Sequence, residues 1–301
     1  MLQLDVLLLD ADFWRWQPHP EVWLVVGVVV TMGFYVSRVI APKVQGDITN
    51  RQRGFFVAGV VVLWLASDWP MHDVAEEYLY LVHMVQHLLF TLIMPALFLL
   101  AVPTWLARLL VGSGRVPAVL RRLSRPVVAG VLFNAVAAIT HWSTLVNASV
   151  EIGPLHYFIH FVMVATAFLM WVPVCGPFPE LRMSLPGQMV YLFVMSIIPT
   201  VPGGWLTFAE SPVYNVYNHG DRLWNIGVIA DQQAAGVIMK IGGGLFLWSL
   251  ITYLFFVWAG RHEEANRQGR ILTEPEIQRW EELADELGPS TPSVEDATPR
   301  V

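Results

Sequence analysis

The chain carries little charge: only 14% of its 301 residues are Asp, Glu, Lys or Arg, whereas a soluble domain has about a quarter. Hydrophobic residues make up 55% of the sequence, and the mean hydropathy is +0.52. Too few polar side chains remain to cover a surface that faces water. This composition excludes disordered, collagen-like and disulfide-scaffold classes over most of the length, and it predicts an all-α integral membrane protein.

Several other features are scarce or absent. Cys175 is the single cysteine, so the chain cannot form an internal disulfide or supply two thiolates to one site. The zinc-protease motif HExxH, the P-loop and the Gly-x-Ser-x-Gly elbow do not occur. The net charge of −6 leaves no basic surface for nucleic acid, so we expect no nucleic-acid partner.

Seven stretches are long and apolar enough to cross a bilayer as helices, which predicts a seven-transmembrane-helix bundle. Lys and Arg are concentrated in the loops between alternate pairs of these stretches and in the C-terminal tail. The positive-inside rule therefore predicts an N-terminus outside and a C-terminus in the cytoplasm of a bacterial plasma membrane. The expected spans are residues 22–41, 54–69, 79–103, 127–147, 154–175, 187–208 and 232–259.

The tail contains one further predicted element. Thr273 and Glu276 have the spacing of a capping box, and apolar residues then recur at helical spacing, which predicts a short amphipathic helix at about 274–287. Residues after Gly288 are rich in Pro, Ser, Thr and acidic side chains, so we expect them to be disordered. The expected organisation is an outer interfacial segment (1–21), a seven-helix transmembrane domain (22–260) and a cytoplasmic tail (261–301).

Five histidines fall in the expected spans, all towards the outer side. His83 and His87 are four residues apart, as are His156 and His160, and such pairs share one helix face with a rise of ~6 Å. Two facing pairs would supply four imidazole nitrogens, which suit copper, zinc, iron or nickel. We therefore predict a metal site of these four histidines, with His141 and Met239 as further candidate ligands.

Other interpretations of the same residues remain open. A single histidine at membrane depth commonly hydrogen-bonds to a neighbouring helix rather than binding metal. Histidines from two helices can also ligate haem iron, which would make the protein a haem-bearing electron carrier. Histidine, aspartate and lysine inside the membrane also fit an ion or proton transporter.

Polar residues near the histidines raise four further expectations. Gln86, Asp231 and Gln233 are candidates to orient the imidazoles by hydrogen bonds, although Asp231 also fits an N-cap of the last span. Lys240 lies deep in that span, so we expect it to pair with a carboxylate or to face a polar cavity. Pro199, Pro202, Gly203 and Gly204 should break the sixth span. The acidic residues Asp68, Asp73, Glu76 and Glu77 form either a cation-attracting mouth or an ordinary solvated loop.

Methionines in the same region are ambiguous. A thioether is a soft ligand that favours Cu(I), but methionine is also ordinary packing material in apolar cores. The residues concerned are Met71, Met84, Met163, Met195 and Met239.

Four motifs in order resemble the CtaG-type cytochrome c oxidase assembly factors, and the resemblance covers roughly residues 20–260. The motifs are HMVQHLL at 83–89 with Met94 and Pro95, then His141 with Trp142, then HYFIH at 156–160 with Trp171, and finally Asp231 to Gln233 with Ile238 and Met239.

The resemblance implies a role in maturing the haem–copper terminal oxidase, with delivery of copper, and therefore oxidase subunits and the lipid bilayer as partners. It implies an assembly factor or metallochaperone rather than an enzyme. The oxidase's dinuclear copper centre faces outside, as does the predicted histidine layer. A second copy of the chain stays open as a further partner.

Overall fold

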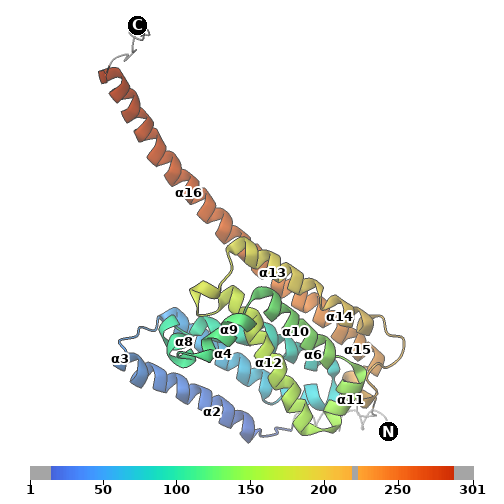
Figure 1. The fold of residues 1–301 in the computed structure, drawn as a ribbon. Coiled ribbons are helices and arrows are strands. Elements are labelled where there is room, and N and C mark those ends of the chain that lie inside the picture. The colour runs from blue at the N-terminus through green and yellow to red at the C-terminus, as the bar shows by residue number, and fades with distance from the viewer. Residues whose placement is uncertain (1–14, 219–222, 288–301) are drawn as a thin grey trace, which may run out of the picture. The chain divides into compact units, whose positions relative to one another are not determined.

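The computed structural model describes residues 15–218 and 223–287, and every regular element in these ranges is helical. The prediction of an all-α chain is therefore confirmed (Figure 1). The α-helices are α2 (Pro20–Tyr35), α3 (Ala41–Lys43), α4 (Asn50–Ser67), α5 (Met71–Asp73), α6 (Tyr80–Leu88), α7 (Met94–Ala101), α8 (Thr104–Val111), α9 (Arg115–Leu123), α10 (Pro126–Thr140), α11 (Ser143–Glu151), α12 (Gly153–Cys175), α13 (Leu185–Ile197), α14 (Thr200–Thr207), α15 (Val228–Val237) and α16 (Gly243–Leu287).

Shorter helical turns connect several of these helices. The π-helical turns are η1 (Val36–Ile40), η2 (Val74–Tyr78), η3 (Leu89–Ile93) and η7 (Ile238–Gly242), and the 3₁₀ turns are η4 (Pro179–Leu181), η5 (Asn215–Tyr217) and η6 (Leu223–Asn225). A π-helical turn is a costly interruption of an α-helix that is common at functional sites. Two of these turns directly flank α6, and a third follows α15.

The described helices include several that can cross a membrane. Five continuous helices are long and apolar enough, and the number rises to seven if each of two bent pairs is one span. The bent pairs are α4 with the α5–η2 segment, at 49°, and α9 with α10, at 73°. The chain is thus a helical protein with several apolar spans, as a multi-pass membrane protein requires.

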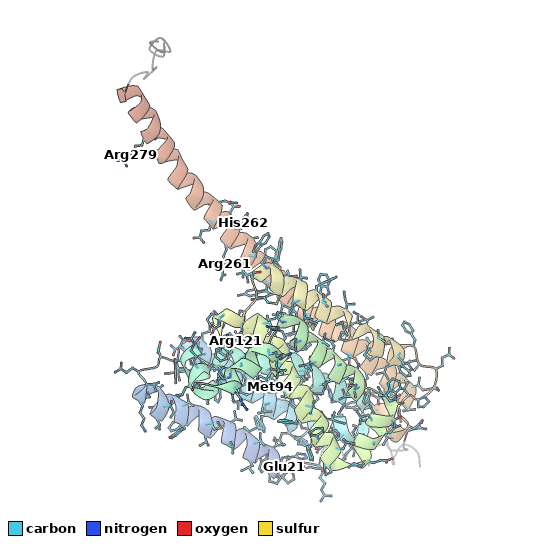
Figure 2. The ribbon with its side chains drawn as sticks, viewed as in Figure 1. Glu21, Met94, Arg121, Arg261, His262 and Arg279 are labelled. Carbon is cyan, nitrogen blue, oxygen red and sulfur yellow. The ribbon has the colours of Figure 1, made fainter. Side chains whose placement is uncertain are left out.

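Residues 1–252 and 253–301 form two separate compact units. Within the first, α4 packs against α7, α10 against α12, and α14 against α15, and Met94 at the start of α7 is buried among these helices (Figure 2). Helix α2 has no buried residue although it is apolar on all sides. A helix of this kind is typical of a membrane span whose side chains face lipid.

Three of the predicted spans differ in detail from the helices of the structure. The fourth span was expected to continue to residue 147, but α10 ends at Thr140 and α11 begins at Ser143, with His141 as the C-terminal cap of α10. Helix α4 begins at Asn50, before the expected residue 54, because Thr49 and Gln52 form a reciprocal capping box. The predicted break in the sixth span is only a short interruption at Ile198 and Pro199, because Pro202, Gly203 and Gly204 lie inside α14 and residues Leu185–Thr207 still form one span.

The C-terminal tail also differs from the prediction. Thr273 was expected to begin a new helix, but it lies inside α16, which runs without interruption from Gly243 to Leu287. Figure 2 shows Arg261, His262 and Arg279 along this one helix. The segments predicted at 1–14 and after Leu287 lie outside the described residues.

Candidate metal centre

The two histidine pairs come together in the structure. Candidate ligand atoms of His83, His87 and His160 all lie within 4.8 Å of one another. The Nε2 atoms of His83 and His87 are 2.9 Å apart, and the ring centroids of His156 and His160 are separated by 4.4 Å. Helices α6 and α12 therefore present their imidazoles to a common point, as the i,i+4 spacing predicts.

A carboxylate joins this cluster. Oε1 of Glu76, on the π turn η2, lies 3.2 Å from Nδ1 of His83 and 3.2 Å from Nε2 of His156. Ligand atoms of Glu76, His156 and His160 also lie within 4.8 Å of one another. The four imidazoles and this carboxylate are called the histidine–glutamate cluster below.

Glu76 was not among the ligands expected from the sequence, which placed it in an acidic mouth. A signal was nevertheless present, because Glu76, His83 and His87 are spaced by seven and four residues, as residues on one helix face are. The helix is interrupted at η2 and Leu79. The predicted span therefore began at residue 79 and did not include Glu76.

The acidic residues do not form a solvated loop. Asp68 and Asp73 are buried. Asp68 accepts hydrogen bonds from the indoles of Trp23 and Trp64 at 2.9 and 2.7 Å, and Asp73 lies 2.6 Å from Nε2 of His19. These two carboxylates hold the start of α2 against the α4–α5 region, and of the four only Glu77 is exposed.

Asp231 positions the helix that carries the first histidine pair. Leu79 is extended and its side chain provides no cap, so the first N–H groups of α6 need another acceptor. The Asp231 carboxylate, fully buried on α15, accepts from the backbone N–H of Tyr80 at 3.0 Å and of Leu81 at 2.8 Å. Asp231 therefore caps α6 from a distant helix, whereas the sequence suggested a cap of its own helix or a bond to an imidazole.

Helix α12 is fixed to the same region by a hydrogen bond. The indole of Trp171, almost fully buried, donates to the backbone carbonyl of Thr91 at 2.9 Å, and the Thr91 hydroxyl donates to the carbonyl of His87 at 2.6 Å. Helix α12 begins at Gly153 and Pro154, and proline suits the first turn because its missing N–H would be unpaired there anyway. His156 and His160 occupy the first two turns that follow.

A cluster of tyrosines packs against His83 through Tyr80. The Tyr80 ring stacks on His83 with a centroid distance of 5.7 Å and an interplanar angle of 20°. Tyr214 and Tyr217 each lie 4.9 Å from Tyr80. This packing restricts the orientation of the His83 imidazole.

The weaker candidate ligands lie beside the cluster. The His141 ring is 6.2 Å from His87, and its Nδ1 donates to the carbonyl of Ala137 at 2.6 Å. Met239 is buried against Tyr80 and Met84. Both residues line a cavity of about 90 Å³ that His87 also borders. Five methionines line this methionine cavity: Met84, Met163, Met170, Met195 and Met239.

The glutamines expected to orient the imidazoles donate to backbone carbonyls. Gln86 Nε2 donates to Ala66 at 2.6 Å, and Gln233 Nε2 donates to Ala209 at 2.9 Å. Lys240 was expected to meet a carboxylate or a polar cavity. It donates to the carbonyl of Ser196 at 3.0 Å and borders the largely apolar methionine cavity, and within the described residues it has no carboxylate partner.

The donor set of the cluster fits a transition metal. Imidazole and carboxylate together suit copper, zinc or iron, and Nδ1 of His83 and Oε1 of Glu76 are buried without a correctly aligned hydrogen-bond partner. Buried polar atoms are rarely left in this state, and a cation bound by the cluster would fix the orientation of both side chains.

The sequence of the chain is similar to a known protein family and to proteins of two mycobacteria. Residues 33–261 match the family model described as cytochrome c oxidase caa3 assembly factor. The uncharacterized proteins Mb0105 of Mycobacterium bovis and MT0111 of Mycobacterium tuberculosis are each 30% identical over 250 residues. The match includes 74% of this chain but 35% of each relative, so the chain spans about a third of their length. No solved structure matches the chain.

Proposed function

Because this chain belongs to the cytochrome c oxidase caa3 assembly factor family, we propose that it serves oxidase assembly by binding copper in the histidine–glutamate cluster and delivering it to the oxidase. Membership of an assembly factor family implies association with the oxidase and a role other than catalysis. The copper cargo, its site and the metallochaperone activity are the proposal.

One observation carries this proposal: nitrogens of His83, His87 and His160 lie within 4.8 Å of one another inside the helical bundle. Neutral imidazoles at this separation can bind one ion together, and nitrogen ligands without a thiolate suit a cargo that must be held and then released. The methionine cavity next to His87 adds soft thioethers, which favour Cu(I).

The proposed topology places the cluster on the outer side of a bacterial plasma membrane. Seven spans result if each bent pair crosses once, and the Lys and Arg distribution then puts the N-terminus outside and the C-terminus in the cytoplasm. Copper delivery would take place from the extracytoplasmic face. A second copy of the chain remains a candidate partner.

The test is metal analysis of the gently purified protein together with an optical spectrum. We expect copper in the protein or tight uptake of added copper. The double variant His83→Ala with His160→Ala should lose this uptake, because it leaves at most two neighbouring ligands in either part of the cluster. His262→Ala, outside the cluster, is the matched control.

Unchanged copper binding in the His83 and His160 double variant would refute the site. A Soret band would instead indicate the haem-bearing alternative. Ion flux in proteoliposomes that depends on Lys240 would favour the transporter.

A further inference from the structure

We propose that the histidine–glutamate cluster contains two overlapping metal positions, and that an incoming ion passes from the first to the second. The entry position consists of Glu76, His156 and His160, and the inner position consists of His83, His87 and His160. This inference rests on the proposed function, since it describes how the copper site is loaded.

The geometry defines the two positions separately. Ligand atoms within each triad lie inside 4.8 Å of one another, and His160 belongs to both triads. The His160 ring is 4.4 Å from His156 in the entry position and 4.8 Å from His87 in the inner position, measured between centroids. A ring that serves both positions favours one ion at a time and lets that ion change partners without leaving the protein.

The entry position borders a second cavity, of about 490 Å³, called the side cavity here. Glu76, His156 and His160 line it, whereas His83 and His87 do not. The side cavity reaches the surface, because Glu21 and Tyr157 at its edge are 60% and 64% exposed. Its remaining lining includes Val22, Val25 and Val26 of α2 together with Leu63, Ser67, His72, Gln86 and Phe90.

The polar part of this lining suits a passing cation. Oε1 of Gln86 is buried without a hydrogen-bond partner, and Gln86 borders the side cavity together with His72 and Glu76. The side chains of Gln86, His72 and Glu76 thus line one cavity, and an amide, an imidazole and a carboxylate can each interact favourably with a cation.

The inner position faces a different space. Of its three ligands, His87 borders the methionine cavity, whereas His83 and His160 do not. All four histidines also line a small cavity of about 20 Å³ between the two positions. At this position nitrogen ligands replace the carboxylate, and thioethers lie nearby, so the surroundings become softer from entry to inner position. Lys240 borders the methionine cavity as well, and its positive charge opposes movement of a cation beyond the inner position.

The transfer is an exchange of ligands without any change of oxidation state. Bonds from the ion to Glu76 and His156 break, bonds to His83 and His87 form, and the bond to His160 is kept. If His83 and His87 bind the ion through their Nε2 atoms, each of these two rings must carry its proton on Nδ1. The Nδ1 of His83 lies 3.2 Å from Glu76 Oε1, so the released carboxylate is placed to accept that N–H.

The experiment follows the rate and extent of Cu(I) uptake by the full chain in detergent, without oxygen and with Cu(I) as the only added metal. We expect one ion per chain for the wild type. Glu76→Gln removes the negative charge of the entry position, so it should slow uptake by roughly tenfold or more and leave the final stoichiometry at one ion. The neighbouring exposed residue gives the control, because Glu77→Gln should load at the wild-type rate.

Two more variants separate the positions. Val26→Trp narrows the side cavity with an indole and should slow loading, whereas Val28→Trp, at an exposed position outside the cavity lining, should not. The double variant His83→Ala with His87→Ala should keep one weakly held ion at the entry position. If Glu76→Gln fails to fold, the loading rates of Val26→Trp and Val28→Trp still test whether copper enters through the side cavity.

The outcomes distinguish this inference from the proposed function. If the wild type takes up no copper, both fail. If the wild type loads but Glu76→Gln and Val26→Trp load equally fast, or if two ions bind per chain, the two-position inference fails and the proposed function stands.

Discussion

The carboxylate of Asp231 acts as the N-cap of α6, although Asp231 and Tyr80 are 151 residues apart in the chain. It accepts two backbone N–H groups of α6, and the first histidine of the cluster lies within one turn of that point. The residue therefore acts on the metal centre through the backbone rather than through an imidazole.

Asp231→Ala should leave both N–H groups without an acceptor. We expect a loss of about 1–3 kcal/mol in the free energy of unfolding and copper affinity lower by roughly 10- to 100-fold, because α6 would no longer be fixed at its start. Thermal unfolding in detergent and competitive copper titration measure the two effects. Gln233→Ala, on the same helix, removes one hydrogen bond to Ala209 and should leave copper affinity unchanged. An Asp231→Ala protein with wild-type copper affinity would contradict this role.

His19 links the start of α2 to Asp73, and this contact depends on pH. Burial lowers the pKa of His19, but the hydrogen bond and charge of Asp73, together with Glu21, outweigh it and raise the pKa above the ordinary 6.5. A raised folded-state pKa means that the stabilisation is complete below about pH 6.5 and is lost as the pH rises through the folded-state value.

The expected result is a pH-dependent difference between the wild type and His19→Gln. The wild type should be the more stable at pH 6, and the difference should shrink by pH 9, as measured by thermal unfolding at both pH values. A difference that grows with pH would show that His19 stabilises the fold as a neutral ring.

At the scale of elements, three π turns carry residues of the metal centre or adjoin the helices that carry them. The turn η2 carries Glu76, η3 begins at Leu89 just after the helix that carries His87, and η7 carries Met239 and Lys240. Each π turn adds a residue to the helical path and so rotates the side chains on either side of it. The turn η2 in particular lets Glu76 face the imidazoles although α6 starts anew after Leu79.

Helices α14 and α15 approach each other at two glycines. A Cβ on Gly236 would lie 2.6 Å from the carbonyl oxygen of Gly203 and 2.6 Å from the Thr207 hydroxyl. Close packing of this kind through small residues is common between membrane helices. Because Asp231, which caps α6, lies on α15, we expect the separation of these helices to affect the start of α6 as well.

Gly236→Ala should therefore force the two helices apart and destabilise the protein by about 1–3 kcal/mol. Gly204→Ala is the matched control, since a Cβ there meets nothing within 4 Å and alanine is the better helix former. The melting temperatures of both variants in detergent provide the measurement. Equal melting temperatures would mean that the α14–α15 contact adjusts without cost.

At the scale of the whole molecule, we expect oxidase assembly to depend on the membrane domain and only weakly on the C-terminal tail. Cells with His83→Ala and His160→Ala should lose oxidase activity while still producing its subunits, and added copper should restore part of it. Truncation after Arg270 should have a much smaller effect, because the candidate ligands all precede it. Loss of oxidase assembly in the truncated strain alone would mark the protein as a scaffold that acts through its tail.

Much of this protein follows from local patterns in the sequence. The shortage of charge and the long apolar stretches predict an all-α membrane protein, and the four-residue spacing of both histidine pairs puts each pair on one helix face. The motifs around His83, His141, His156 and Asp231 indicate the family, which the match over residues 33–261 confirms. These features depend on composition and on helical periodicity, which neighbouring residues determine by themselves.

Only the tertiary structure decides how distant residues complete the site. It adds Glu76 to the histidines, turns Asp231 into the cap of α6 and gathers five methionines around one cavity. Each of these contacts joins segments far apart in the chain or separated by an irregular turn. Their side chains meet through helix packing and through π turns, which shift the register of a helix face. Periodicity along one segment does not predict the packing of distant helices, and at Glu76 the regular spacing is interrupted by η2 and Leu79.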